Sequence, residues 1–233
     1  MIIPDADPLV GLAWELLKGG AMRKIGKENL EIMAANLAEA AGDLRELEAR
    51  LDYAVNGQMP KGWEGCARIW KRVPLCASTL HVIFEHVYHH VNFAWNSRFA
   101  SAARVAACAK RDYERWMKFP EDFPSLQVSR EVEPIRSIAD GRLNLFNLRM
   151  NIRESMMFLD GVTGEIEKAI GAHLEIGDAD LAWNMELLLG QLNVAWHCRR
   201  YDINRSIELG CRMRNLKRWR KFPREFNRLM KCG

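Results

Sequence analysis

The sequence lacks the short motifs from which an enzymatic activity is usually recognised. It contains no GxxxxGKS/T phosphate-binding loop, no GxSxG nucleophile elbow and no HExxH pair of metal-binding histidines. None of its six cysteines stands at CxxC spacing, which argues against a zinc ribbon or a thioredoxin-like redox site. These absences favour a non-catalytic protein, and no motif implies a cofactor.

Long apolar runs are missing as well. No stretch approaches the roughly 18–20 apolar residues that span a membrane. The start of the chain, Met1 to Asp7, lacks the basic residues and apolar core of a signal peptide. We therefore expect reduced cysteines and a cytoplasmic protein without a membrane partner.

The chain does have enough apolar residues for a core, and its charge is distributed unevenly. Hydrophobic residues make up 48% of the 233 residues, and the net charge is +4. Residues 199–233 hold twelve Lys or Arg against three acidic residues, a net charge of +9, so the remainder carries −5. A basic segment on a mildly acidic body is typical of a protein with a polyanionic partner. A solvated helix face that improves solubility gives the same pattern.

An internal repeat organises the chain. One block recurs 101 positions later, pairing Glu85, Asn92, Ala94, Trp95 and Arg98 with Glu186, Asn193, Ala195, Trp196 and Arg199. Another recurs 115 positions later, pairing Asn29, Leu30, Asn36, Leu37 and Glu39 with Asn144, Leu145, Asn151, Ile152 and Glu154. A third block, from Arg115 to Phe123, returns from Arg218 to Phe226. A duplication over roughly 26–123 and 141–226 predicts two similar units.

Apolar periodicity predicts an all-α fold. Between residues 28 and 55, apolar residues recur at three- and four-residue steps, which is typical of an amphipathic helix, and Asn56-Gly57 ends it. Its copy covers about 144–169. The second helices are expected near 77–98 and 178–199, and the third near 100–118 and 203–221. No alternating pattern indicates a strand.

We predict a helical bundle made of two internally duplicated three-helix units plus a short N-terminal helix. The expected parts are an N-terminal docking helix (1–25), a first unit (26–123), a linker (124–140) and a second unit with a basic C-terminal segment (141–233). A longer loop, with Gly57, Pro60, Gly62, Gly65 and Pro74, separates the first two helices of the first unit. The two units are expected to pack face to face about a pseudo-twofold axis, as one body.

Polar residues repeat near the apolar faces of the helices. At 100° per residue, Arg98 falls within the apolar stripe, and a buried arginine needs a partner because an uncompensated charge is costly. We predict the ion pairs Glu39–Arg98 and Glu154–Arg199 within a structural network, with a duplicated ligand site as the alternative. The network comprises Asn36, Glu39, Glu85, Asn92, Arg98, Asn151, Glu154, Glu186, Asn193 and Arg199.

A histidine cluster resembles a metal site by spacing alone. His81, Glu85 and His89 lie at i, i+4 and i+8 on one helix face, which suits zinc or iron. The second unit replaces both histidines, with Ala182 and Gly190. The four-residue step also differs from the Glu-x-x-His of di-iron bundles. We predict no native metal and keep a helical-bundle metalloenzyme using these three residues as a further alternative.

Cationic residues gather on the third helices. Their spacing in the second unit forms one continuous stripe, and three of the four matching positions in the first unit are also basic. Arginine suits phosphate through its planar fork. The predicted nucleic-acid-binding residues are Arg205, Arg212, Arg214, Lys217, Arg218, Arg220, Lys221, Arg224, Arg111, Arg115 and Lys118. Trp116 and Trp219, at matched helix ends, are predicted to pack each unit closed rather than to stack on bases.

Together these features predict a non-catalytic helical subunit that binds RNA or DNA within a larger nucleoprotein assembly. It would contact the phosphate backbone through its basic C-terminal helix face and would also contact protein subunits. In general character it is similar to the helical small subunits of CRISPR effector complexes, which are α-bundles with basic faces; the likeness is one of fold type only. A protein-binding adaptor or inhibitor is the alternative, because the acidic body, the N-terminal helix and the basic segment each offer a docking surface.

Overall fold

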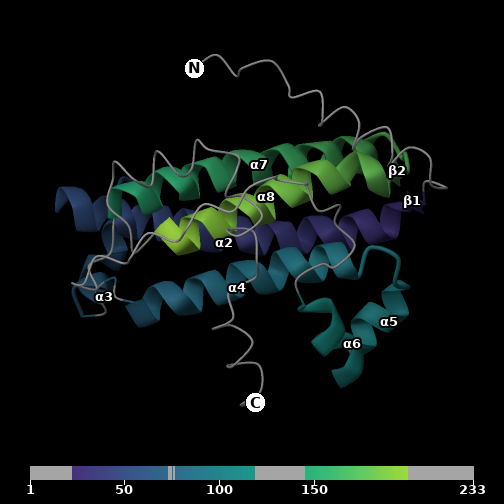
Figure 1. Cartoon of the computed structure of the whole chain (residues 1–233), viewed down its shortest axis with the longest axis horizontal. Helices are drawn as coiled ribbons and strands as arrows, with labels where there is room; N and C mark the ends of the chain where they lie inside the picture. The colour runs from purple at the N-terminus through teal and green to yellow at the C-terminus, as the bar shows by residue number, and fades with distance from the viewer. Residues whose placement is uncertain (1–22, 73–74, 76, 119–144, 199–233) are drawn as a thin grey trace, which may run out of the picture.

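The computed structural model describes residues 23–72, 75, 77–118 and 145–198, and these residues are predominantly helical (Figure 1). The all-α prediction is therefore confirmed. None of the helices in these ranges is both long and apolar enough to cross a membrane.

Four long helices lie side by side along the length of the molecule (Figure 1). They are α2 (Lys27–Asn56), α4 (Ala77–Asn96), α7 (Leu145–Gly171) and α8 (Asp178–Cys198). Their bounds agree with the four long helices expected from the apolar periodicity. Gly57 explains why α2 ends at Asn56. It takes a left-handed φ of 68°, and its N–H donates to the Tyr53 carbonyl. Glycine favours that conformation, so Asn56-Gly57 stops the helix as predicted.

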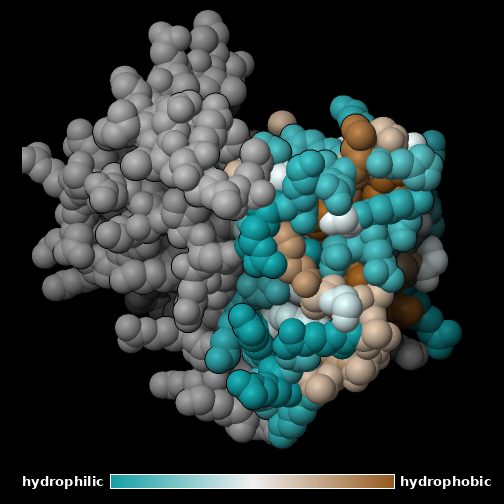
Figure 2. Space-filling view, turned by 90° about the vertical axis from the view of Figure 1, so that its right-hand side faces the viewer, coloured by the Kyte–Doolittle hydropathy of each residue, from teal (hydrophilic) through white to brown (hydrophobic). Residues whose placement is uncertain are grey.

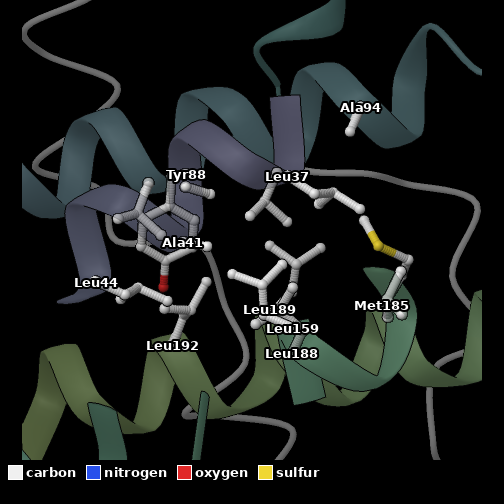
Figure 3. Close-up of a cluster of buried hydrophobic side chains, with 14 of the residues drawn as sticks. Leu37, Ala41, Leu44, Tyr88, Ala94, Leu159, Met185, Leu188, Leu189 and Leu192 are labelled. Atoms are coloured by element: carbon white, nitrogen blue, oxygen red, sulfur yellow. The ribbon is translucent and has the colours of Figure 1, made fainter. Parts of the chain in front are cut away.

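The long helices share one hydrophobic core. Helix α2 packs on both α4 and α7, and α7 also packs on α8. Matched positions of the repeat lie fully buried in this core (Figure 3). In α2 and α7 they include Leu37 and Ile152, Leu44 and Leu159, and Leu51 and Ile166; in α4 and α8 they include Val87 and Leu188, and Val91 and Leu192.

Helices α2 and α7 run antiparallel, and ion pairs fix their register. Near one end, Arg149 Nε lies 2.5 Å from Asp52 Oδ1, and Arg153 pairs with Glu48. At the other end, β1 (Lys24–Ile25) pairs antiparallel with β2 (Ile176–Gly177). This two-residue ladder was not predicted, since two residues are too few to show an alternating pattern.

Two further expectations need correction. The loop after α2 contains a short 3-10 helix, η1 (Glu64–Cys66), and a helical segment, α3 (Ala67–Arg72). The third helix of the first unit is not continuous: α5 (Ala102–Ala107) and α6 (Lys110–Trp116) are separated at Cys108, whose φ is 37°. No glycine or proline marks this break, so the sequence pattern did not indicate it.

Several predicted parts lie outside the described residues. These are the N-terminal docking helix up to residue 22, the linker, and the third helix of the second unit with the basic C-terminal segment.

Candidate functional site

Helices α5 and α6 form a small module beside the end of α4, at the right of Figure 1. The module has its own hydrophobic cluster, separate from the main core, formed by Phe93, Ala100 and Trp116. The ring of Trp116 meets the ring of Phe93 nearly edge-on, with centroids 5.1 Å apart, and is only 2% exposed. The prediction that this tryptophan packs the unit closed is confirmed.

Asparagine side chains of α4 hold the C-terminal end of α6. Asn92 Nδ2 donates to the Met117 carbonyl at 3.0 Å, and Asn96 Nδ2 donates to the carbonyls of Trp116 at 3.0 Å and Lys118 at 2.6 Å. The last carbonyls of a helix have no partner within the helix, so these amides satisfy acceptors that would otherwise need water. The opposite surface of α6 is left facing solvent.

That surface borders an open hollow of about 580 Å³. Its lining consists of Arg104, Ala109, Arg111, Asp112, Glu114, Arg115 and Lys118. All three basic residues predicted for the first unit, Arg111, Arg115 and Lys118, are therefore brought together here, and all three are exposed. Figure 2 views this end of the molecule, where hydrophilic side chains lie beside paler apolar ones at the level of α5 and α6.

The hollow has a positive balance of charge. Arg104 and Asp112 form a two-pronged ion pair, with Arg104 Nε 2.6 Å from Asp112 Oδ2 and the second guanidinium nitrogen on the other oxygen. This hydrogen bonding holds the pKa of Asp112 below its usual value and raises the pKa of Arg104. The other charged residues of the lining are three cations, Arg111, Arg115 and Lys118, and one anion, Glu114. The hollow therefore has a net positive charge, which suits an anion.

The repeated polar residues make equivalent contacts in the two halves. Asn36 Oδ1 lies 3.3 Å from His90 Nδ1, joining α2 to α4. At the matching positions, Gln191 Nε2 donates to Asn151 Oδ1 at 2.6 Å, joining α8 to α7. The same Gln191 amide donates to Glu154 at 2.6 Å. Partial burial of the carboxyl raises the pKa of Glu154, although the residue as a whole is exposed.

The predicted Glu39–Arg98 ion pair is wrong. Arg98 Nη2 lies 3.9 Å from Asp178 Oδ2, and the Arg98 guanidinium sits over the Trp95 ring at 3.8 Å. Glu39 is exposed on α2. Asp178 stands in the first turn of α8 and has no repeat partner among the network residues, so a search limited to repeated positions missed it. Arg199, and hence the predicted Glu154–Arg199 pair, lies outside the described residues.

The other network residues lie at the packed surfaces of α4 and α8. Asn92, Asn193 and Glu186 are buried, whereas Glu85 is half-buried. The Tyr88 hydroxyl donates to Asn193 Oδ1, which ties the two helices together inside the core. A buried hydrogen bond of this kind fixes how the helices dock.

Two of the three weak metal candidates, His81 and His89, face different neighbours. The ring of His81 lies edge-on to Trp196, with centroids 5.4 Å apart, and the ring of His89 contacts Tyr113 at 5.4 Å. Burial, followed by the neighbouring His90 and His86, lowers the pKa of His89 to about 4. Within the described ranges, no three His, Cys, Asp or Glu side chains come close enough to hold a metal ion.

Sequence reasoning missed Arg104 and Asp112 as members of the lining of the hollow, and it did not point to Tyr113, which packs against His89. They do not belong to the repeated blocks on which the search was based, and the break between α5 and α6 decides where they point. No local pattern points to the pair of Arg104 and Asp112, because the two residues stand on different helices on either side of the break at Cys108.

The remaining predicted phosphate-binding residues lie outside the described part of the chain. They are Arg205, Arg212, Arg214, Lys217, Arg218, Arg220, Lys221 and Arg224. Comparison with known proteins adds no assignment: no family model matches the sequence, and no curated protein or solved structure is significantly similar to it.

Proposed function

We propose that this chain is a non-catalytic helical subunit of a nucleoprotein assembly that binds the phosphate backbone of nucleic acid. Two surfaces would bind it: the hollow beside α6 and the basic segment at residues 199–233. The observation that supports the proposal is the placement of Arg111, Arg115 and Lys118 along one exposed hollow. Arginine and lysine at such a surface bind phosphate and release counterions from the nucleic acid.

Binding of labelled single- and double-stranded RNA and DNA across a salt series tests the proposal. We expect affinity to fall steeply with salt, by a log–log slope of about 0.9 per phosphate bound on duplex DNA or about 0.7 on a single strand. Arg111→Glu combined with Arg115→Glu should weaken binding to every sequence. It should also reduce the slope by about one for each phosphate that the variant no longer binds. Arg214→Glu with Lys217→Glu tests the second surface in the same way.

Helix α3 offers a matched control. Arg68 and Lys71 are also exposed basic residues on a short helix, but α3 lies at the opposite end of the molecule from α6 (Figure 1). Arg68→Glu with Lys71→Glu makes the same change in net charge and should leave affinity almost unchanged. If both double variants lose the same affinity for nucleic acid, the loss comes from the change in net charge and not from the hollow beside α6. Unchanged binding in the α6 variant would remove the hollow from the proposal.

We also infer that the two halves descend from one duplicated unit arranged about a pseudo-twofold axis. Equivalent burial and the matched contacts Asn36–His90 and Asn151–Gln191 support this. Arg45 Nη2 lies 3.9 Å from Asp160 Oδ1 across the antiparallel pair α2 and α7. These two residues stand 115 positions apart, so each faces its own repeat counterpart, as a residue near a twofold axis does.

A further inference from the structure

Asn193 in α8 stands at the repeat position of Asn92 in α4, and both side chains are fully buried. Asn92 Nδ2 donates to the Met117 carbonyl at the end of α6, 3.0 Å away. Asn193 Oδ1 accepts from the Tyr88 hydroxyl, whereas its Nδ2 has no hydrogen-bond partner among the described residues. A buried donor without an acceptor is costly, so we expect an acceptor for this amide outside the described ranges.

The next residue of α8 points the same way. Val194 stands at the repeat position of Phe93, which packs against Trp116. Val194 is only 4% exposed, yet it belongs to neither of the two hydrophobic clusters that the described residues form. Within the described part of the chain, neither Asn193 Nδ2 nor Val194 has the neighbour that α6 supplies to its counterpart.

The sequence after α8 contains a second copy of that neighbour. Three residues define the module formed by α5 and α6: Ser101 caps α5 by accepting from the Arg104 N–H, Cys108 separates the two helices, and Trp116 packs against Phe93. At an offset of 103 their counterparts are Asn204, Cys211 and Trp219. Asparagine and serine are both favoured at the cap of a helix, so the counterparts retain all three features.

We propose that residues 204–221, which lie outside the described ranges, form a second module that docks on the end of α8. Asn193 Nδ2 donates to the carbonyl of Arg220, the counterpart of Met117, and Trp219 packs against Val194. The second module then carries its own anion-binding hollow. The ligand of this hollow, the phosphate backbone, rests on the proposed function, whereas the docking does not.

The second hollow is the more positive of the two. The lining of the first has four basic and two acidic side chains, a net charge of +2. The counterparts of its seven residues have five basic and no acidic side chains, a net charge of +5; they are Ile207, Arg212, Arg214, Asn215, Lys217, Arg218 and Lys221. Affinity for phosphate rises with the number of cations that contact it, so the second hollow is the stronger site.

Hydrogen exchange tests the docking without nucleic acid. Residues 204–221 should be protected to a similar degree as residues 102–117. Asn193→Ala should speed exchange in residues 204–221 roughly 2- to 12-fold, the factor that corresponds to one hydrogen bond. Tyr88→Phe is the matched control, because it removes the hydroxyl that bonds to Asn193 Oδ1 but leaves Nδ2 in place, and it should not change exchange there.

Two results would overturn the docking. The first is exchange of residues 204–221 at the rate of an unstructured chain, which would leave the end of α8 as a docking surface for another protein. The second is equal acceleration of that segment in Asn193→Ala and Tyr88→Phe.

Matched charge reversals compare the two hollows. Arg214→Glu with Arg218→Glu stands at the repeat positions of Arg111→Glu with Arg115→Glu, so both variants make the same change in net charge. With labelled duplex DNA, the first variant should lose more affinity at the same salt concentration. It should also reduce the log–log salt slope by about 0.9 for each phosphate contact removed.

The outcomes separate this inference from the proposed function. If the α6 variant loses as much affinity as the other or more, the second hollow is not the stronger site, while phosphate binding stands. If the original protein binds no nucleic acid at low salt, the proposed function fails and the role of both hollows fails with it, whereas the docking is decided by hydrogen exchange alone.

Discussion

His89 shows how one residue depends on the packing around it. Its ring lies between α4 and α6, and burial lowers its pKa from 6.5 to about 4. Nothing in the run of four histidines between positions 81 and 90 singles it out. Its surroundings make it a packing residue at neutral pH rather than a cation.

The lowered pKa predicts a pH dependence of stability. Between about pH 6.5 and about pH 4 the unfolded chain binds the His89 proton and the folded chain does not, so the free energy of unfolding decreases as pH falls through this window. We expect a loss of about 1–2 kcal/mol, below the full linkage value because the ring is only partly buried. Urea unfolding at several pH values measures it.

His89→Leu is the matched variant for this measurement, because it retains an apolar side chain and removes the titrating group. Its stability should decrease less than that of the original protein over the same pH window. If both proteins lose the same free energy of unfolding, then another group causes the acid sensitivity.

Helices α5 and α6 behave as an element attached to the main body through few contacts. Their cluster with Phe93 is separate from the main core, and Asn29 Nδ2 on α2 contacts the Ala100 carbonyl at 2.5 Å. Such an element has a lower local stability than helices buried on several sides.

Asn96→Ala should loosen α6 selectively. The change removes donors to the Trp116 and Lys118 carbonyls, and each of these hydrogen bonds is worth about 0.5–1.5 kcal/mol. We expect faster hydrogen exchange in residues 102–117 and unchanged exchange in α2 and α7. Asn184→Ala, which removes an exposed amide contact to Glu165, is the control. Faster exchange throughout the chain would show that α5 and α6 unfold only with the whole molecule.

At the scale of the whole molecule, one core joins the two halves. Leu44 in α2 and Leu159 in α7 occupy matched positions of the repeat, and both are fully buried in the same cluster (Figure 3). Because α2 packs directly on α7, neither half buries its apolar face without the other.

This arrangement predicts a single cooperative unfolding transition. Leu44→Ala and Leu159→Ala should each destabilise that transition by about 2–5 kcal/mol, the usual cost of a cavity at a buried leucine. Met157→Ala, at a side chain that is 73% exposed, should change stability by less than about 0.5 kcal/mol. Calorimetry, or urea unfolding monitored by two spectroscopic probes, shows whether the protein unfolds in one transition or in two. Two transitions, with each leucine variant shifting only one, would mean that the halves unfold independently.

Local periodicity was sufficient for the long helices and for much of their buried surface. The three- and four-residue steps predicted α2 and α7, and Gly57 ended α2 because its left-handed conformation is available at little cost. Matched positions of the repeat share the core, and the basic residues Arg111, Arg115 and Lys118 of the first unit line one hollow.

The pairing of distant side chains was decided only by the tertiary structure. Arg98 meets Asp178 because α8 begins beside the end of α4, which no local pattern shows. The break at Cys108 follows from docking Trp116 against Phe93 and Asn96, and it determines that Arg104 and Asp112 pair and that Tyr113 faces His89. A periodic pattern reports which face of a helix is apolar; which neighbour meets each polar residue depends on how the helices approach one another.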